Sequence, residues 1–193
     1  MVVLAHPRPG SFCHALADRV RSTAEAAGHV VTVHDLDAEG FEPVRGADDL
    51  VRAHRAGLVD ADGLAVVHPN WWGKPPAILA GWLDRVVVPG VAYELPDAAG
   101  VPTGLLRLRG ALVLNTGDTP PERERVVFGD PLDAVWRRCV LDFCGVPPEA
   151  VHRRLFGPLA GSTASVRGEW LAEAARLAAT AFPPVGPTVV DGA

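Results

Sequence analysis

The alternation of short β-rich segments with longer helical segments restricts the fold of this chain more than any other feature. The predicted strands are residues 2–5, 30–33, 64–67, 111–114 and 151–155. The predicted helices are residues 12–27, 48–59, 76–87, 133–143 and 170–182. Alternation repeated in this way forms a mostly parallel sheet with helices on both faces. The sequence therefore predicts a single α/β domain over residues 1–182, followed by an irregular tail over residues 183–193.

The first helix has the clearest pattern of any single element. Its apolar positions recur every fourth residue, at Phe12, Leu16, Val20 and Ala24. Ser11 is the predicted N-cap, and Gly28 is the predicted residue just beyond the C-terminus. We therefore expect one face of this helix to pack on the sheet.

The predicted strands suit a doubly wound sheet with five strands in the order 2-1-3-4-5. In this order the winding reverses between strands one and three, and ligands bind beyond the carboxyl ends of the strands at the reversal. The loops that follow residues 5, 67 and 114 are therefore the places where we expect a binding site.

The first of these loops, residues 6–12, leads into the N-terminus of the first helix. A helix N-terminus has unpaired N–H groups and about half a unit of positive charge, which together suit a phosphate. Ser11 adds a hydroxyl donor, and His6 or Arg8 could add charge. Taken alone, this loop is also compatible with a plain strand end followed by a capped helix.

The second loop, residues 68–76, contains Trp71 and Trp72 between prolines. Large aromatic side chains in a loop need something to pack against, and either a planar ligand or a partner subunit would provide it. In the third loop, Thr116 and Gly117 follow the fourth strand, and the glycine lets backbone amides approach a ligand closely. A plain turn is the alternative interpretation of the third loop.

The sequence also argues against several other classes of site. It has no G-x-G-x-x-G after the first strand, no G-x-x-x-x-G-K-S/T and no G-x-S-x-G. Phosphoacceptor receiver domains share the topology, but they need acidic residues where this chain has His6 and His68. The net charge of -5 argues against nucleic acid or anionic lipid as the main partner.

The cysteines and the first residues of the chain bear on the compartment. Cys13, Cys139 and Cys144 include no C-x-x-C pair, and their odd number fits free thiols in a reducing compartment. No secretory signal is recognisable, and the apolar runs fall short of the roughly 20 residues of a membrane helix. We therefore expect a cytoplasmic protein without membrane insertion.

The histidines and the remaining tryptophans are expected to be structural. The seven histidines are scattered, with no i, i+4 pair beside a carboxylate, so no metal is predicted. Surface or strand-end positions are expected for all of them except His6. Trp82 and Trp136 lie at helical spacing among apolar residues, so we expect them in the core or in a dimer contact.

Several motifs occur along the chain up to about Val146. They are Ala5-His6-Pro7 with Ser11-Phe12; Pro69, Trp71-Trp72, Pro76-Ala77-Ile78-Leu79, Gly81-Trp82 and Asp84-Arg85-Val86; Pro89-Gly90 and Ala92-Tyr93; Thr116-Gly117; and Gly129-Asp130, Trp136 and Leu141-Asp142-Phe143-Cys144-Gly145. Together these motifs resemble the flavodoxin-like NAD(P)H:quinone oxidoreductases, the family that includes mammalian DT-diaphorase and bacterial modulators of drug activity. The stretch from Trp71 to Arg85 is the most specific part of the match.

The resemblance implies a flavodoxin-like fold and a homodimer with a flavin at the subunit interface. It implies FAD, with FMN as the alternative, and a ping-pong reaction in which NAD(P)H gives hydride to flavin N5. A quinone or a similar small planar substrate then takes hydride from the same position.

The resemblance also assigns expected roles to individual residues. His6, Ser11 and Phe12 would contact the flavin phosphates, and Cys13 stands where the family often has Asn. Backbone donors in the third loop would stabilise the charge that develops at flavin N1 on reduction. The residues expected around the isoalloxazine are Pro69, Asn70, Trp71, Trp72 and Gly73, with Thr116 and Gly117 at its pyrimidine side.

One departure from the family pattern leaves the catalytic residues unpredicted. Some members carry a Tyr and a His after the third loop, where they relay charge during hydride transfer. The matching stretch here, residues 122–128, contains neither, and the single tyrosine of the chain is Tyr93. Two alternatives therefore stay open: a flavin-bound regulatory or accessory subunit, and a reductase of a specialised aromatic biosynthetic intermediate.

Overall fold

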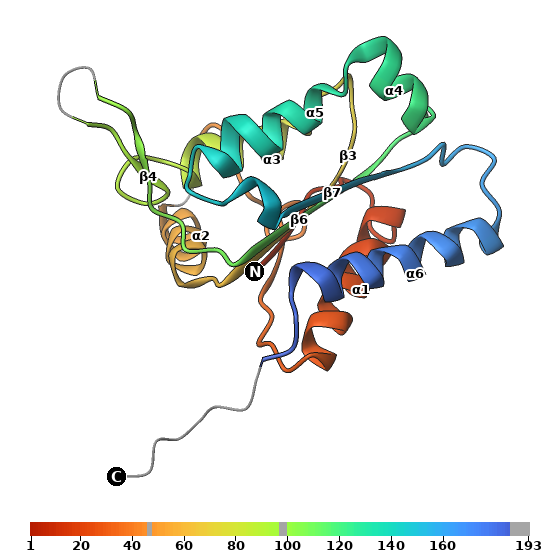
Figure 1. Ribbon diagram of the computed structural model, residues 1–193, viewed down its shortest axis with the longest axis horizontal. Coiled ribbons are helices and arrows are strands. Elements are labelled where there is room, and N and C mark those ends of the chain that lie inside the picture. The colour runs from red at the N-terminus through yellow and green to blue at the C-terminus, as the bar shows by residue number, and fades with distance from the viewer. Residues whose placement is uncertain (46–47, 97–99, 186–193) are drawn as a thin grey trace, which may run out of the picture.

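A five-stranded parallel sheet forms the centre of the molecule (Figure 1). The computed structural model describes residues 1–45, 48–96 and 100–185. The sheet order is β2-β1-β3-β6-β7, which is the predicted doubly wound order when the sheet strands are counted along the chain. Its strands are β1 (Val2–Leu4), β2 (Val33–Asp35), β3 (Gly63–Pro69), β6 (Gly110–Thr116) and β7 (Val151–Phe156). The predicted fold class is therefore confirmed.

Helices cover both faces of this sheet. Figure 1 shows α1 and α6 together on one side, and α2, α3 and α5 on the other. The helices are α1 (Phe12–Ala26), α2 (Asp48–Asp60), α3 (Ala77–Val86), α4 (Pro121–Phe128), α5 (Pro131–Asp133) and α6 (Ala164–Ala181). A π-helical segment η1 (Ala134–Asp142) continues α5, and a 3-10 turn η2 (Pro148–Ala150) precedes β7.

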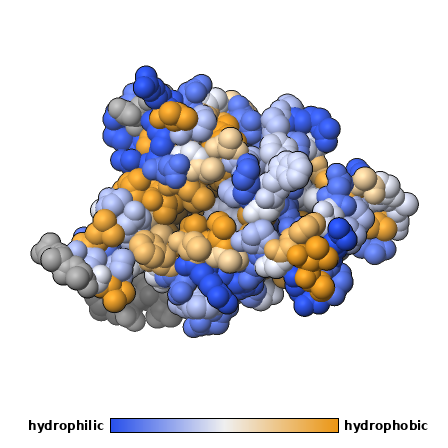
Figure 2. Space-filling model, turned by 90° about the horizontal axis from the view of Figure 1, so that it is seen from above, coloured by the Kyte–Doolittle hydropathy of each residue, from blue (hydrophilic) through white to orange (hydrophobic). Residues whose placement is uncertain are grey.

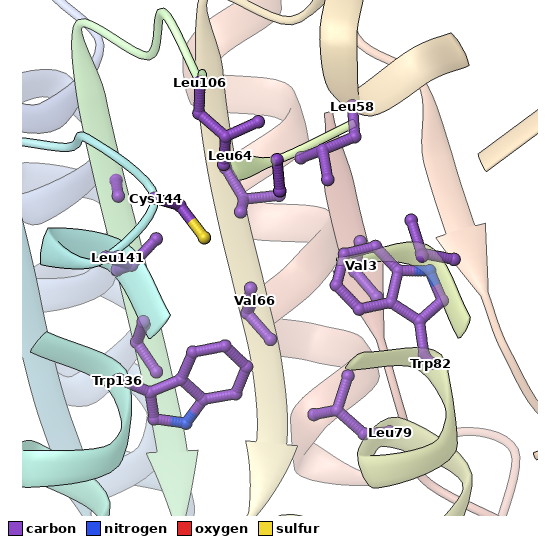
Figure 3. Close-up of a cluster of buried hydrophobic side chains, with 14 of the residues drawn as sticks. Val3, Leu58, Leu64, Val66, Leu79, Trp82, Leu106, Trp136, Leu141 and Cys144 are labelled. Carbon is purple, nitrogen blue, oxygen red and sulfur yellow. The ribbon is translucent and has the colours of Figure 1, made fainter. Parts of the chain in front are cut away.

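The core is divided by the sheet into two layers. Successive strand residues point to opposite faces, so Leu64 and Val66 belong to one layer while Ala65 and Val67 belong to the other. The first layer also holds Trp82 and Trp136, both fully buried (Figure 3). Of the two expectations for these tryptophans, the core position is therefore the one that the structure supports.

Helix α1 agrees with its prediction, whereas the strand after it does not. The helix begins directly after Ser11, and Gly28 takes a left-handed φ of 90° just beyond its end. The strand predicted at residues 30–33 forms instead at Val33–Asp35, and Val30 is 98% exposed. An edge strand has one neighbour, so its position follows the pairing of Val2 with Val33 and not the apolar content of the segment.

The second half of the chain differs more from the prediction. Helix α4 was not predicted, nor was the antiparallel pair β4 (Tyr93–Glu94) and β5 (Thr103–Gly104). The helix predicted over residues 133–143 is mostly π-helical, and α6 begins at Ala164 because Thr163 caps it. Residues 183–185 are irregular, as predicted for the tail, whereas residues 186–193 lie outside the described part of the chain.

Candidate functional site

The three predicted loops meet at the carboxyl edge of β1, β3 and β6. The backbone N–H of Asn70 in the second loop donates to the carbonyl of Thr116 at 2.6 Å. The Cys13 thiol and the Thr116 hydroxyl are 3.2 Å apart, which joins the start of α1 to the end of β6. The rings of His6 and Trp71 lie with their centroids 6.1 Å apart. The predicted site residues therefore lie in one region, and their roles stay predictions.

Ser11 occupies the N-cap position of α1, but its hydroxyl does not cap the helix. Ser11 is 5% exposed, and its Oγ lies 2.8 Å from Nδ1 of His14. Nε2 of His14 in turn lies 3.1 Å from a carboxylate oxygen of Asp35, the last residue of β2. The first turn of α1 contains no acidic residue, so its free N–H groups stay available to an anion.

Two further groups border this helix N-terminus. Nδ1 of His6 accepts a hydrogen bond from the backbone N–H of Arg8 at 3.1 Å, and burial together with Arg8 lowers the pKa of His6. Burial also raises the pKa of Cys13 to about 12, so its thiol is neutral and unreactive at ordinary pH. The Cys13 thiol is therefore uncharged, and the surroundings of His6 favour its neutral form.

Arg167 in the first turn of α6 also reaches the first loop, and sequence reasoning missed it. Its guanidinium carbon lies 6.0 Å from the centre of the Phe12 ring, and its Nε donates to the Ser162 hydroxyl at 2.8 Å. Phe12 packs on Trp170 of the same helix, with ring centroids 5.8 Å apart. Only the packing of α1 on α6 brings Arg167 here, since about 155 residues separate it from Phe12 in the sequence.

The second loop holds its two tryptophans in a strained tight turn. Trp71 and Lys74 pair through both backbone hydrogen bonds, and the Gly73 N–H donates to the Asn70 side-chain oxygen at 2.9 Å. Trp72 takes a left-handed φ of 60°, rare for a bulky residue, and is 96% exposed. The turn therefore presents one large aromatic ring to its surroundings with nothing in the described chain packed over it.

A Cβ at Gly73 would collide with Pro131 of α5, so the second loop rests directly on that helical segment. The Asn70 side-chain amide also donates to Oε1 of Glu124 at 2.8 Å, and Glu124 is buried on α4. The loop is thus held from the side of α4 and α5, two elements that follow the third loop.

A buried polar network lies beneath the second and third loops. Nδ1 of the fully buried His68 donates to the Pro69 carbonyl at 2.8 Å. Its Nε2 then accepts from the Trp136 indole N–H and from the Asn115 amide, each at 2.9 Å. Burial lowers the pKa of His68 to about 4, so the ring is neutral. His68 is the penultimate residue of β3, as expected for a strand-end histidine, and tryptophan and asparagine from distant segments satisfy its buried ring. The expectation of surface or strand-end positions is wrong for His54, which is fully buried within α2.

An ion pair extends this network to the turn between α4 and α5. Nε of Arg153 donates to the Asn115 side-chain oxygen at 2.9 Å, and Nη1 donates to Asp130 at 2.7 Å. The Arg153 side chain is 4% exposed, and Asp130 takes a left-handed φ of 44°. The strained Asp130 is therefore held by the Arg153 guanidinium, which has little access to water.

Helix α4 contains neither the Tyr nor the His that some family members use to relay charge. It presents Val126, Val127 and Phe128 as exposed apolar side chains, and Arg123 lies over the Phe128 ring at 5.5 Å. The face of the molecule seen from above carries hydrophobic patches among hydrophilic ones (Figure 2). The matching stretch of this chain therefore has charged residues at positions 122–125 and apolar residues at positions 126–128.

A second buried histidine belongs to a separate cluster of His34, Glu39 and His54, whose ligand atoms lie within 4.8 Å of one another. The Trp82 indole N–H donates to Nδ1 of His54 at 2.8 Å, so Nε2 of His54 carries the proton and donates to Glu39. A metal on Nε2 would need that proton on Nδ1, where the indole already points a donor. The cluster is therefore a hydrogen-bonded group, and the absence of a metal stays a prediction.

A parallel sheet in this order, with three loops converging at the reversal of strand order, defines a doubly wound α/β protein. The chain belongs to the family Flavodoxin_2, described as having a flavodoxin-like fold, whose model matches residues 1–176. The resemblance stated from the motifs is thereby confirmed. Among the described residues, no helix is both long and apolar enough to cross a membrane.

Named relatives agree with the predicted class of enzyme. The chain is 30% identical to ribosyldihydronicotinamide dehydrogenase (quinone) of Pongo abelii, over 75% of this chain and 76% of that protein. It is 29% identical to an uncharacterized NAD(P)H oxidoreductase of Haemophilus influenzae, over 82% of this chain and 83% of that protein. The structure of an NAD(P)H:quinone oxidoreductase from Methanothermobacter marburgensis matches with a TM-score of 0.76 at 25% identity, covering 92% of this chain and 93% of that one. The predicted class, an oxidoreductase of this family, is confirmed.

Proposed function

We propose that this protein is a flavin-dependent oxidoreductase that passes hydride from NAD(P)H to a quinone or a similar planar acceptor. The observation that carries the proposal is the second loop, which sets Trp71 and the exposed Trp72 beside an uncapped helix N-terminus at the ligand-binding edge. An aromatic ring and a phosphate seat at one edge suit a ligand that contains a planar ring and a phosphate. The names of the relatives support the same reaction.

The residues present fit a flavin at this edge. Ser11, with His6 and Phe12, stands at the free N–H groups of α1, where the phosphate would be held. Arg167 adds a positive charge next to the Phe12 ring. The bound flavin would supply two-electron hydride transfer, which no amino-acid side chain supplies.

Other residues would hold the ring. The strained turn from Pro69 to Gly73 would flank its plane, with Trp72 as the most exposed wall. Thr116 and Gly117 would border its pyrimidine side. The Gly117 N–H already donates to the Phe156 carbonyl at 3.1 Å, so this glycine does not supply the backbone donor expected there. Cys13 contributes a buried neutral thiol that contacts Thr116, so it supports the third loop and offers no charge.

A second copy of the chain would complete the site. A single chain presents Trp72 with 96% of its surface exposed and places no wall opposite it in the described residues. We therefore propose a homodimer with the flavin at the interface, built from the domain over residues 1–182, working in the reducing cytoplasm where the free cysteines stay reduced. Light scattering coupled to size exclusion tests this assembly, and a monomer in the flavin-loaded protein would contradict it.

The absence of a Tyr and a His from α4 favours two alternatives to quinone reduction. Without a Tyr and a His on that helix, the chain could serve as a flavin-bound regulatory or accessory subunit. It could instead reduce a specialised aromatic biosynthetic intermediate whose apolar rim contacts Phe128. Slow turnover with every quinone, together with tight binding to another protein, would favour the subunit; turnover confined to one aromatic substrate would favour the specialised reductase.

The first experiment is the visible spectrum of the purified protein, followed by mass identification of the compound released by heat. Flavin absorbance would support the proposal, and the mass would distinguish FAD, the expected form, from FMN. Steady-state oxidation of NADH and of NADPH with a series of quinones would then test the reaction. A colourless protein that also fails to take up added flavin would overturn the proposal.

A further inference from the structure

Ser11, His14 and Asp35 form a hydrogen-bonded series at the N-terminus of α1. The Ser11 hydroxyl and Nδ1 of His14 are 2.8 Å apart, and Nε2 of His14 is 3.1 Å from the Asp35 carboxylate. An N-cap serine ordinarily accepts from a backbone N–H of the first turn. Here the backbone N–H of His14 donates to the backbone carbonyl of Ser11 at 3.0 Å. The Ser11 hydroxyl does not cap the helix and is turned toward the His14 imidazole instead.

The donors and acceptors of this series are fixed by the carboxylate. Asp35 accepts hydrogen bonds only, so Nε2 of His14 carries a proton and donates to it. In a neutral ring Nδ1 then has a lone pair, which accepts the Ser11 hydroxyl proton. In this state Ser11 offers no proton to a ligand at the helix N-terminus.

The ionised diphosphate of FAD has only acceptor oxygens, so it competes with His14 for the Ser11 proton. If Ser11 donates to the phosphate, Nδ1 of His14 loses its hydrogen-bond donor while partly buried. A second proton on His14 restores this bond in the opposite direction, from Nδ1–H to Ser11 Oγ. It also leaves a positive ring next to the bound anion.

We propose that Ser11, His14 and Asp35 make the phosphate seat proton-coupled, so that binding of a flavin phosphate at α1 takes up a proton on His14. This inference rests on the proposed function, since it assumes that a phosphorylated flavin binds at this edge. It assigns His14 as a positioning residue that acts on the ligand through Ser11.

Charged groups lie around His14. Asp35 lies on one side, and Asp37 is close enough that His6 and His14 both lower its pKa, against the rise caused by burial and by Asp35. One carboxylate oxygen of Asp37 is buried without a partner. His6 has its ring centroid 6.4 Å from that of His14, and Arg8 lies beyond it as the opposing positive charge. Two carboxylates thus face a ring that has one cation on its far side.

The test is isothermal titration of the apoprotein with riboflavin, FMN and FAD in buffers of different ionisation enthalpy. Riboflavin has the ring without the phosphate, so it reports the ring site alone. We expect FAD to bind with net uptake of up to about one proton relative to riboflavin, and its affinity to fall about tenfold or more from about pH 6 to about pH 8. FAD is the cleaner ligand because the phosphate of FMN itself loses a proton at about pH 6.

Two variants complete the design. His14→Gln keeps a polar side chain without the titrating group, and we expect it to fold and to bind FAD without proton uptake. His29→Gln removes a histidine beyond the other end of α1 and should leave the uptake unchanged. Circular dichroism confirms that both are folded.

The outcomes separate the two proposals. If none of the three flavins binds, the proposed function fails. If riboflavin and FAD bind with equal proton exchange in the native protein, or if His14→Gln keeps the uptake, the flavin site stands and the proton-coupled seat is wrong. Binding of riboflavin alone would place the phosphate elsewhere and would also overturn this inference.

Discussion

The two sides of the predicted ligand-binding edge are built by different means. On the side of α1, a regular helix follows its sequence pattern, and the groups at its N-terminus are partly exposed and titratable. On the side of α4, α5 and η1, the backbone is left-handed at Asp130 and π-helical after it, and the polar groups beneath are buried. A partly exposed series can exchange protons with solvent, whereas a buried network fixes one geometry. The first side therefore suits recognition of the charged phosphate of the proposed flavin. The second side suits fixed placement of the flavin ring.

The largest expected change in stability comes from breaking the ion pair of Arg153 and Asp130, which lies on the side of α4 and α5. Arg153→Ala would leave Asp130 without its partner, and we expect a loss of about 3–5 kcal/mol in the free energy of unfolding. Arg154→Ala is the matched control, because its pair with Glu173 is partly exposed and is worth at most about 1 kcal/mol. Urea unfolding of both variants measures the difference in free energy of unfolding. Equal losses would show that the more buried pair contributes no more to stability than the partly exposed pair.

A pH effect of nearly this size should come from His68. Its folded pKa of about 4 lies below the unfolded value of about 6.5, so the unfolded chain binds more protons between these values. Stability is therefore complete above about pH 6.5 and falls as the pH drops toward 4, by about 3 kcal/mol. Burial also lowers the pKa of His54, which adds to the same slope.

Urea titrations across this pH range check that slope. His68→Gln should flatten it, whereas His29→Gln should leave it unchanged, because His29 lies away from the buried network. A native protein whose stability is constant from about pH 6.5 to about pH 4 would show that His68 is charged in the folded state.

The two buried tryptophan–histidine pairs provide a finer comparison. Trp82→Phe would leave Nδ1 of His54 without its indole donor, at about 1–3 kcal/mol. Trp136→Phe removes a similar bond, but Nε2 of His68 keeps the Asn115 amide, so we expect a smaller loss. Both substitutions remove the same side-chain volume. Thermal unfolding of the two variants therefore compares the contributions of the two lost hydrogen bonds to stability. The reverse order would mean that Asn115 does not bond His68 in solution.

The smallest expected effect on stability, and a positive one, concerns the strained turn. Trp72→Gly should raise the free energy of unfolding by about 1 kcal/mol, because glycine tolerates the left-handed φ of 60°. Flavin retention should fall in this variant and in Trp72→Ala, by about 0.5–1.5 kcal/mol of ring packing. Flavin occupancy and melting temperature, measured on the same samples, would have to move in opposite directions in Trp72→Gly.

Sequence reasoning defined α1 and the meeting of the three loops, and it missed contacts on both sides of the edge. The repeat from Phe12 to Ala24 defined α1, and the strand order alone placed the three loops together. The position of β2 depends on pairing with β1, which no local pattern records. The burial of His68 depends on Trp136, and Arg167 reaches Phe12 only through the packing of α6 on α1. Each missed feature joins segments that are distant in the sequence.

The contact of Gly73 with Pro131 has a consequence for evolution and for engineering. It joins the aromatic turn to the segment that follows the third loop, so a change in either piece has to fit the other. Grafting the second loop of a relative onto this chain without its α4–α5 turn would leave the graft poorly seated. Redesign of the aromatic turn should therefore replace residues on both sides of that contact together.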